Sequence, residues 1–319
     1  MSAAPDQPAP ASGLADRLTA TGLLAGWATL KALPASLTAP LFRFGADRAA
    51  ARDGAGVRQL RANLRRVLGP TAGPAELDAA VRDGMRSYAR YWLETFRLPV
   101  MDHDDVVRRV TAESTGLEYI DAALAQGRGA VLALPHSGNW DVAGLMGRRR
   151  WGSLTTVAER LKPERVYEKF LSYRESLGME ILPLTGGVSP SEVLKERLTA
   201  GGVVALLADR DLSRRGVPVT FFGEPTRMPA GPAMLAALTG AALFPVHLSY
   251  TADGWRQTIG PEITLPGTRL REQVHGGTQA VADVLAREIA TAPADWHMLQ
   301  PLWLADLPES RRAALGDQR

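Results

Sequence analysis

Short apolar runs and helical patterns alternate along the last two thirds of this 319-residue chain. An apolar run bounded by turn residues is typical of a strand that is buried on both faces. From Gly116 onward such runs predict strands at Ala130–Leu134, Leu154–Ala158, Glu180–Leu184, Val203–Ala208, Pro218–Phe222, Leu243–Leu248 and Trp255–Ile263. Helical patterns lie between several of them, at Leu117–Gln126, Pro163–Leu177, Ser189–Ala200 and Pro229–Leu238. The alternation predicts an α/β fold with a central, mostly parallel or mixed sheet flanked by helices.

The part of the chain before Gly116 carries helical patterns, which predict helices over Val57–Leu68 and Ala75–Arg97. Near the N-terminus the longest uncharged run is Leu18–Leu30, with 13 residues. A transmembrane helix needs about 20 apolar residues, so no membrane span is predicted. The first residues also lack a basic region followed by an apolar core, so no secretory signal is predicted.

Two short amphipathic helices are expected at the N-terminus, with a proline-containing break between them. Leu23, Trp27 and Leu30 share one helical face, and Leu37, Leu41 and Phe44 share another. These faces either lie in a membrane interface, with Trp27 and Phe44 as anchors, or pack on the core of the domain. The sequence predicts a single domain over residues 14–308, with residues 14–50 as a membrane-facing helical segment. Residues 1–13 are expected to form a disordered tail and residues 309–319 a second tail.

Composition removes several classes of chemistry. The chain has no cysteine, which excludes disulfides, thiolate metal sites and cysteine nucleophiles. Its net charge is +3, and its basic residues gather at residues 58–66, 148–150 and 160–169. A nucleic-acid-binding protein is expected to have a longer basic stripe with interleaved aromatic residues, so that class is not predicted. The clusters suit an anionic lipid surface or a phosphorylated ligand, or they are ordinary solvated arginines.

The segment Pro135-His136-Ser137-Gly138-Asn139-Trp140-Asp141 directly follows a predicted buried strand. Open α/β sheets place their chemistry at such strand ends. A histidine there can act as a general base, because its unperturbed pKa of about 6.5 is close to neutral pH. The sequence therefore predicts His136 as a catalytic base; a strand-end histidine that only bonds a loop is the alternative.

Two carboxylates are candidates for orienting the imidazole of His136. In a regular helix, Asp141 would lie on a different face from His136, because neighbours on one face are three or four residues apart. Asp141 therefore reaches the imidazole only if residues 137–139 form a turn; otherwise it anchors the following helix. Asp209 ends another predicted strand, within Asp209-Arg210-Asp211, and is expected to be at least as important as Asp141.

A third candidate segment is Phe221–Pro225 with Arg227–Ala233, where a Gly/Pro turn is expected to lead into an apolar helix whose N-terminus can face an anion.

Three rival sites receive little support. Ser137 adjoins His136, but the chain has no G-x-S-x-G elbow. The five histidines are scattered without a metal-ligand spacing, so no metal is predicted. The glycines of Gly127-Arg128-Gly129 precede a strand, so they are no dinucleotide fingerprint.

A strand that ends in a histidine, four residues and an aspartate resembles the glycerolipid-type acyltransferases. The fuller pattern resembles the late acyltransferases of lipid A biosynthesis, over residues 14 to 305. That pattern consists of Pro135–Asp141, Tyr173-Arg174-Glu175, Ala208–Asp211, and Phe221-Phe222-Gly223 with Pro229–Ala233. One segment departs from it: the chain has Asp295-Trp296-His297-Met298 where the lipid A enzymes carry a basic motif. The departure favours a branch whose acceptors are phosphatidylinositol mannosides.

The resemblance implies that an acyl group, palmitoyl, passes from acyl-CoA to a sugar hydroxyl of a membrane glycolipid, with acyl-CoA as a co-substrate and no cofactor. His136 would be the base in a direct ternary reaction, and Asp209 or Asp141 would hold it. Residues expected to bind substrate are Asn139, Trp140, Arg174, Arg210, Glu224 and Arg227. Alternatives are a surface ion pair of Arg174 with Glu168 or Glu175, a structural pair of Arg210 with Asp141, and loop-shaping roles for Glu224 and Arg227.

Trp140 and Trp303 are expected to stack on sugar faces or to pack in the core. The resemblance places the protein at the cytoplasmic face of the plasma membrane, as a peripheral protein on an anionic surface. Three other functions remain open, and the first is acylation of another, lipid A-like glycolipid. A non-catalytic lipid-binding or transfer protein explains the apolar helices but not His136 and Asp209. An ester hydrolase of the α/β class needs a nucleophile that the sequence does not supply.

Overall fold

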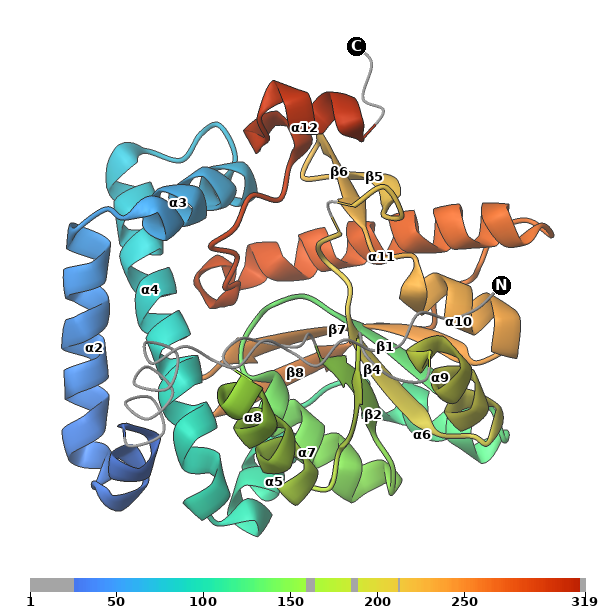
Figure 1. The fold of residues 1–319 in the computed structure, drawn as a ribbon, viewed down its shortest axis with the longest axis horizontal. Coiled ribbons are helices and arrows are strands. Elements are labelled where there is room, and N and C mark those ends of the chain that lie inside the picture. Colours follow the sequence, from blue (N-terminus) through green and yellow to red (C-terminus); the bar gives the residue numbers. More distant parts are fainter. Residues whose placement is uncertain (1–25, 159–163, 185–188, 212, 316–319) are drawn as a thin grey trace.

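The computed structural model describes residues 26–158, 164–184, 189–211 and 213–315. Its centre is a six-stranded sheet in the order β3-β2-β4-β1-β7-β8 (Figure 1). The strands are β1 (Ala130–Leu134), β2 (Thr155–Ala158), β3 (Glu180–Pro183), β4 (Val203–Leu207), β7 (Ala242–Tyr250) and β8 (Trp255–Ile259). All neighbours are parallel except β7 and β8, which are antiparallel. The mixed sheet confirms the α/β fold that the sequence predicts.

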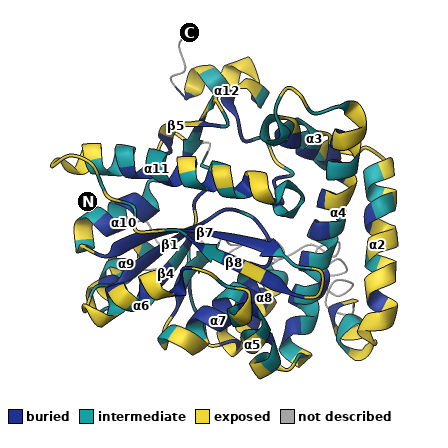
Figure 2. Ribbon diagram, turned by 180° about the vertical axis from the view of Figure 1, so that it is seen from behind, coloured by how far each residue is buried: buried dark blue, intermediate teal, exposed yellow. Residues whose placement is uncertain are grey.

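Helices cover both faces of this sheet (Figure 1). The first layer contains α5 (His103–Ala112), α6 (Leu117–Ala125), α7 (Trp140–Trp151) and α8 (Glu164–Ser176). The second contains α9 (Pro190–Thr199), α10 (Gly231–Thr239) and α11 (Leu270–Thr291). Because both faces are covered, every residue of β1 is buried, which explains its unbroken apolar sequence (Figure 2).

Three further helices form one side of the molecule. The long helix α4 (Pro74–Arg97) runs beside the sheet, and α2 (Ala35–Ala51) and α3 (Ala55–Leu68) pack against it (Figure 1). Short 3₁₀ turns follow at η1 (Leu98–Val100), η2 (Pro293–Asp295) and η3 (Leu304–Asp306). Within the described residues, no helix is long and apolar enough to cross a membrane.

The two N-terminal apolar faces have different environments. Residues 26–32 are helical, and the chain breaks before α2 at Pro34, as expected. Trp27 is only 4% exposed and packs against Phe96, Phe170 and Tyr173. The interpretation of Trp27 as a membrane anchor is therefore wrong, because its ring belongs to the core.

The second N-terminal apolar face does not pack on the core. Leu37, Leu41 and Phe44 of α2 are more than 60% exposed (Figure 2). The expected disordered tail of residues 1–13 lies outside the described residues.

The hairpin formed by β5 (Val217–Phe221) and β6 (Glu224–Met228) differs from the sequence prediction. The prediction has one strand, then a Gly/Pro turn that leads straight into a helix. A second strand intervenes, because Phe222 and Gly223 adopt positive φ angles of 49° and 78° and reverse the chain in two residues. Pro225 argues against a strand in a sequence, but it is tolerated in this two-stranded ribbon.

Two C-terminal helices are also absent from the prediction. Helix α11 contains Gly276 and Gly277, which weaken its helical pattern. A side chain on Gly277 would meet Leu265 at 2.5 Å, so the glycine allows close packing there. Helix α12 (Glu309–Ala314) falls in the expected tail of residues 309–319. That prediction is wrong up to residue 315, because Leu315 is buried in a small cluster with Leu304 and Leu307.

Candidate active site

The pairing of β1 with β4 brings two distant parts of the sequence together. The strands are parallel and in register, so that Leu134 lies opposite Leu207 at their common end. Two residues beyond each of these positions are His136 and Asp209. Both side chains therefore emerge at the carboxyl edge of the sheet, on neighbouring strands.

His136 and Asp209 form a direct hydrogen bond. The Nδ1 atom of His136 lies 2.6 Å from Oδ1 of Asp209. The Asp209 side chain is completely buried, whereas that of His136 is 34% exposed. Because an ionised carboxylate only accepts hydrogen bonds, Nδ1 carries the proton and Nε2 keeps a lone pair. This is the arrangement in which a histidine can take a proton from a substrate.

Asp209 is held by three donors. Besides the imidazole, the backbone N–H of His136 donates to Oδ2 at 2.9 Å, and the indole N–H of Trp296 donates to the same oxygen at 3.0 Å. Burial by itself raises the pKa of Asp209, but the charge and hydrogen bonds of His136, together with Trp296, outweigh it. The pKa of this carboxyl group is therefore held below 3.8, and it stays ionised at neutral pH.

The pairing with Asp209 raises the pKa of His136 above 6.5. Burial by itself lowers it, and the charge and hydrogen bond of Asp209 more than reverse that effect. The nearby positive charge of Arg210 lowers it slightly. A base acts in its deprotonated form, so activity that depends on His136 should rise with pH through a midpoint above 6.5.

The loop after His136 turns sharply into α7. Gly138 has a positive φ of 54°, and a side chain on it would meet the backbone of Leu248 at 2.8 Å. Only glycine fits that position. Asn139 caps α7, because its Oδ1 accepts hydrogen bonds from the N–H groups of Asp141 and Val142. Its Nδ2 donates to Glu94 on α4 at 2.8 Å, so Asn139 has a structural role here.

Asp141 does not contact the imidazole. It lies in the first turn of α7, and its Oδ1 accepts a hydrogen bond from Nε of Arg174 at 2.7 Å. The Asp141 side chain is 1% exposed and that of Arg174 is 20% exposed, so this ion pair is largely buried. As a direct partner of His136, Asp141 is contradicted by the geometry. The alternative of a surface pair of Arg174 with Glu168 or Glu175 is wrong as well.

An apolar cavity lies between the sheet and α7, near the His136–Asp209 pair. We call it the apolar slot, because most of its lining side chains are apolar. Its lining includes Ala143, Gly144 and Trp151 of α7, and Leu132, Leu134 and Ala205 of the sheet. Trp140 lines it and meets the His136 ring edge-on at 6.1 Å between centroids. Asp141 and Arg174 also line it, so their ion pair forms part of its wall.

Other predicted residues are placed as follows. The Nε of Arg210 donates to the carbonyl of Pro301 at 2.9 Å, close enough to His136 to affect its pKa. Arg227 donates to the carbonyls of Gly216 and Leu315, and Glu224 pairs with Arg66 at 2.9 Å. Glu224 and Arg227 lie in the β5–β6 hairpin, so the alternative of loop-shaping roles describes them better than substrate binding (Figure 1).

Trp303 is completely buried, and its indole N–H donates to the carbonyl of Phe221 at 2.9 Å. It packs in the core and is not available to a sugar. Ser137 is also fully buried, and its Oγ accepts a long hydrogen bond of 3.4 Å from the N–H of Leu248. Its burial argues against a serine nucleophile. Across the described part of the chain, no group of three histidine or carboxylate side chains could hold a metal ion.

Sequence reasoning missed Trp296 as a site residue. The segment Asp295-Trp296-His297 stood out only as a departure from a family pattern. Nothing in its local pattern tells that the indole reaches a carboxylate 87 positions earlier. Sequence reasoning missed it because Trp296 and Asp209 are far apart along the chain and meet only in the folded protein.

The fold and the site define an α/β protein with a hydrogen-bonded His136–Asp209 pair beside an apolar slot. The family model of bacterial lipid A biosynthesis acyltransferases matches residues 17–305, and the chain belongs to this acyltransferase family. The match covers the sheet, the His136–Asp209 pair and the strand-end segments described above.

Curated relatives are similar over nearly the whole chain. A phosphatidylinositol mannoside acyltransferase of Mycolicibacterium smegmatis is 53% identical over 305 residues, which covers 95% of this chain and 97% of the relative. A protein of the same name from Mycobacterium tuberculosis is 53% identical over 309 residues, with 96% and 95% covered. These similarities extend beyond the catalytic segments and include the N-terminal helices.

The two aspartates should respond differently to replacement by asparagine. We expect Asp209→Asn to lower the turnover of an acyl-transfer reaction by about 10²- to 10⁴-fold, because the imidazole loses its orienting carboxylate. Its remaining activity should also have an acid limb at lower pH, because burial then dominates the pKa of His136. Rate measurements between pH 5 and 9 check both expectations.

Asp141→Asn should act mainly on stability. It leaves the Arg174 charge largely buried without a partner, which costs about 3 to 5 kcal/mol. Thermal denaturation measures this loss, and activity is then expressed per folded molecule. Equal losses of turnover at both positions, or a loss at Asp141 alone, would contradict the assignment of Asp209 as the partner of His136.

Proposed function

We propose that this protein transfers a long-chain acyl group, palmitoyl, from acyl-CoA to a mannose hydroxyl of a phosphatidylinositol mannoside. The observation that carries the proposal is the His136–Asp209 pair, whose imidazole meets Trp140 in the lining of the apolar slot. Family membership supports the acyl transfer. The names of the relatives at 53% identity support the acceptor.

In this reaction Nε2 of His136 takes the proton of the acceptor hydroxyl while that oxygen attacks the thioester carbonyl. Asp209 stabilises the imidazolium that forms, without taking the proton itself. The tetrahedral intermediate collapses, the carbon–sulfur bond breaks, and the imidazolium protonates the departing thiolate. The products are the ester and free CoA. Because the chain has no cysteine, a direct transfer is simpler than a relay through an acyl-thioester on the enzyme.

The apolar slot suits the acyl chain. Trp140, Ala143 and Gly144 line it from α7, and Leu132, Leu134 and Ala205 line it from the sheet. Most of the lining side chains are apolar, and they include Leu154 and Met179. An apolar lining favours a long hydrocarbon chain over acetyl or other short groups.

Arg210 is our candidate for stabilising negative charge on the reacting thioester or on the carrier's phosphates. Its charge lowers the pKa of His136, which supports a position close enough to act on charge that develops in the reaction. Arg174 instead holds Asp141 and shapes the slot, so we propose no oxyanion role for it.

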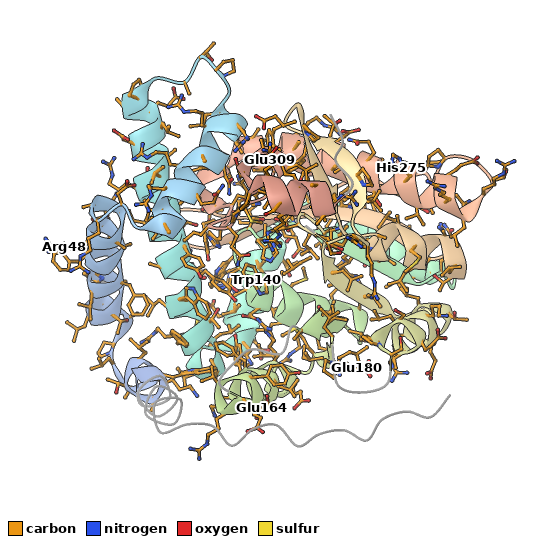
Figure 3. All side chains as sticks on the ribbon, turned by 45° about the horizontal axis from the view of Figure 1, so that its top comes forward. Arg48, Trp140, Glu164, Glu180, His275 and Glu309 are labelled. Carbon is orange, nitrogen blue, oxygen red and sulfur yellow. The ribbon has the colours of Figure 1, made fainter. Side chains whose placement is uncertain are left out.

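The protein is proposed to work as a peripheral protein on the anionic, cytoplasmic face of the membrane. Leu37, Leu41 and Phe44 lie on one stripe of α2 and are 62%, 61% and 63% exposed. Arg48 continues the stripe and points away from the molecule (Figure 3). An apolar row that ends in a basic residue fits an interface with acidic lipid. By contrast, Arg66 and Arg150 of the basic clusters are engaged with carboxylates of the protein itself.

The central test is transfer of radiolabelled palmitate from palmitoyl-CoA to purified phosphatidylinositol mono- and dimannosides. Wild-type protein should form an acceptor-dependent product, and His136→Ala should reduce its formation by at least about 10²-fold while still binding the donor. Absence of product with both acceptors, from wild-type protein that binds palmitoyl-CoA, would refute the acceptor and direct the search to other glycolipids. Donor loss to water without acceptor would indicate a hydrolase instead.

Shortening the slot should change the preferred donor. Ala143 lines the slot along α7, so Ala143→Leu should reduce transfer from palmitoyl-CoA about tenfold or more and spare transfer from octanoyl-CoA. Ala143→Ser, which adds little volume, serves as the matched control. Equal effects of the leucine variant on both donors would show that the chain lies elsewhere.

The membrane contact is tested with vesicles that contain phosphatidylinositol. We expect Phe44→Glu to lower the sedimenting fraction by about three- to tenfold, since partial burial of a phenylalanine is worth about 1 kcal/mol. Ser36→Glu adds the same charge to α2 away from the apolar stripe and should bind nearly as well as wild type. If both variants bind alike, the stripe is not the membrane contact.

A further inference from the structure

The segment that follows α11 forms backbone hydrogen bonds with the loop that carries His136. The carbonyl of Asp295 accepts a hydrogen bond from the N–H of Gly138 at 2.9 Å. The N–H of His297 donates to the carbonyl of His136 at 2.7 Å, and Ser137 and Trp296 form an antiparallel bridge. Three consecutive residues, 295–297, thus bind three consecutive residues of the catalytic loop, 136–138.

The middle residue of this segment also reaches the carboxylate. Trp296 is completely buried, and its indole N–H donates to Oδ2 of Asp209 at 3.0 Å. The backbone N–H of His136 donates to the same oxygen at 2.9 Å. With Oδ2 fixed by two donors, Oδ1 is left to face the imidazole at 2.6 Å. The plane of the carboxylate is therefore set by groups other than the histidine side chain.

The surroundings of Trp296 keep its indole in one position. Its ring packs at 6.1 Å from Phe221, 6.4 Å from Phe222 and 6.1 Å from Trp303. Since cores of this kind pack densely, rotation of the indole away from Asp209 would require its neighbours to move. The donor is preorganised, so it needs no rearrangement during a reaction.

We infer that Trp296 is a positioning residue for the acyl-transfer reaction: its indole N–H orients the Asp209 carboxylate and takes up part of its negative charge. This inference rests on the proposed function of the His136–Asp209 pair. Trp296 touches no reacting atom and acts only through Asp209. Loss of the indole donor should raise the pKa of His136. A carboxylate with one hydrogen-bond donor fewer attracts the imidazolium more strongly, and so stabilises the protonated form of His136.

The groups that face His136 make this effect measurable. Asp209 and Arg210 are the charged groups that shift its pKa, and His297 is the titratable group that responds to its charge. Burial, together with the charge of His136, lowers the pKa of His297 to about 3, so it stays neutral over the working range. An acid limb near neutral pH therefore reports on His136.

The test compares Trp296→Phe with Trp303→Phe. Both remove an indole N–H from a completely buried tryptophan and so take one donor from an acceptor: Oδ2 of Asp209, which keeps the backbone N–H of His136, in the first, and the carbonyl of Phe221 in the second. Their losses of stability should be similar. Trp296→Phe should move the acid limb of kcat/KM upward by a few tenths to about one pH unit, which is up to about a tenfold loss on the acid side. Trp303→Phe should leave the limb in place.

A second measurement separates this inference from the proposed function. The titration of the His136 imidazole is followed by NMR, with its signal assigned from its absence in His136→Ala. An upward shift in Trp296→Phe alone would support the positioning role even if the acceptor proved to be a different glycolipid. Identical His136 titrations in the wild type and in both tryptophan variants would overturn the inference, whatever the activities are.

Discussion

The in-register parallel pairing of β1 with β4 is the constraint on which the rest of the site depends. It places Leu134 opposite Leu207, and so brings His136 beside Asp209 although 73 positions separate them. A slip of one residue would turn alternate side chains to the opposite face and replace Asp209 by a neighbour. The helix α7 and the wall of the apolar slot follow from the same register, because both begin where the β1 strand ends.

The two carboxylates near His136 have the same chemistry and different surroundings. Asp209 has the imidazole and two further donors, and it supports a base. Asp141 has the guanidinium of Arg174, and it joins α7 to α8 in the wall of the slot. Replacing a buried ion pair by apolar residues is often neutral, so such a pair is weak evidence for stability. Its location indicates that it fixes the position of α7 relative to the base.

The unbroken apolar runs predicted β1 and β4 closely, and the polar residues at their ends made Asp209 a candidate partner of His136 beside Asp141. What escaped prediction depends on contacts between distant residues. The strand β6 contains Pro225, which the sequence alone marks as a strand breaker, and α11 contains two glycines that are explained only by packing. A tryptophan on an apolar helical face, such as Trp27, is typical of a membrane anchor, yet Phe96 and Phe170 pack against it. The role of Trp296 could not be predicted, because it depends on the hydrogen bond of its indole to Asp209.

The order of these parts along the chain has a consequence for biosynthesis. Both His136 and Asp209 are made long before residues 295–297, which bind the loop and the carboxylate from the far side. Until residues 295–297 have been made, one face of the loop has no partner and Oδ2 of Asp209 lacks its indole donor. The surroundings of the His136–Asp209 pair are therefore complete only after residue 297 has been made, well after both members of the pair.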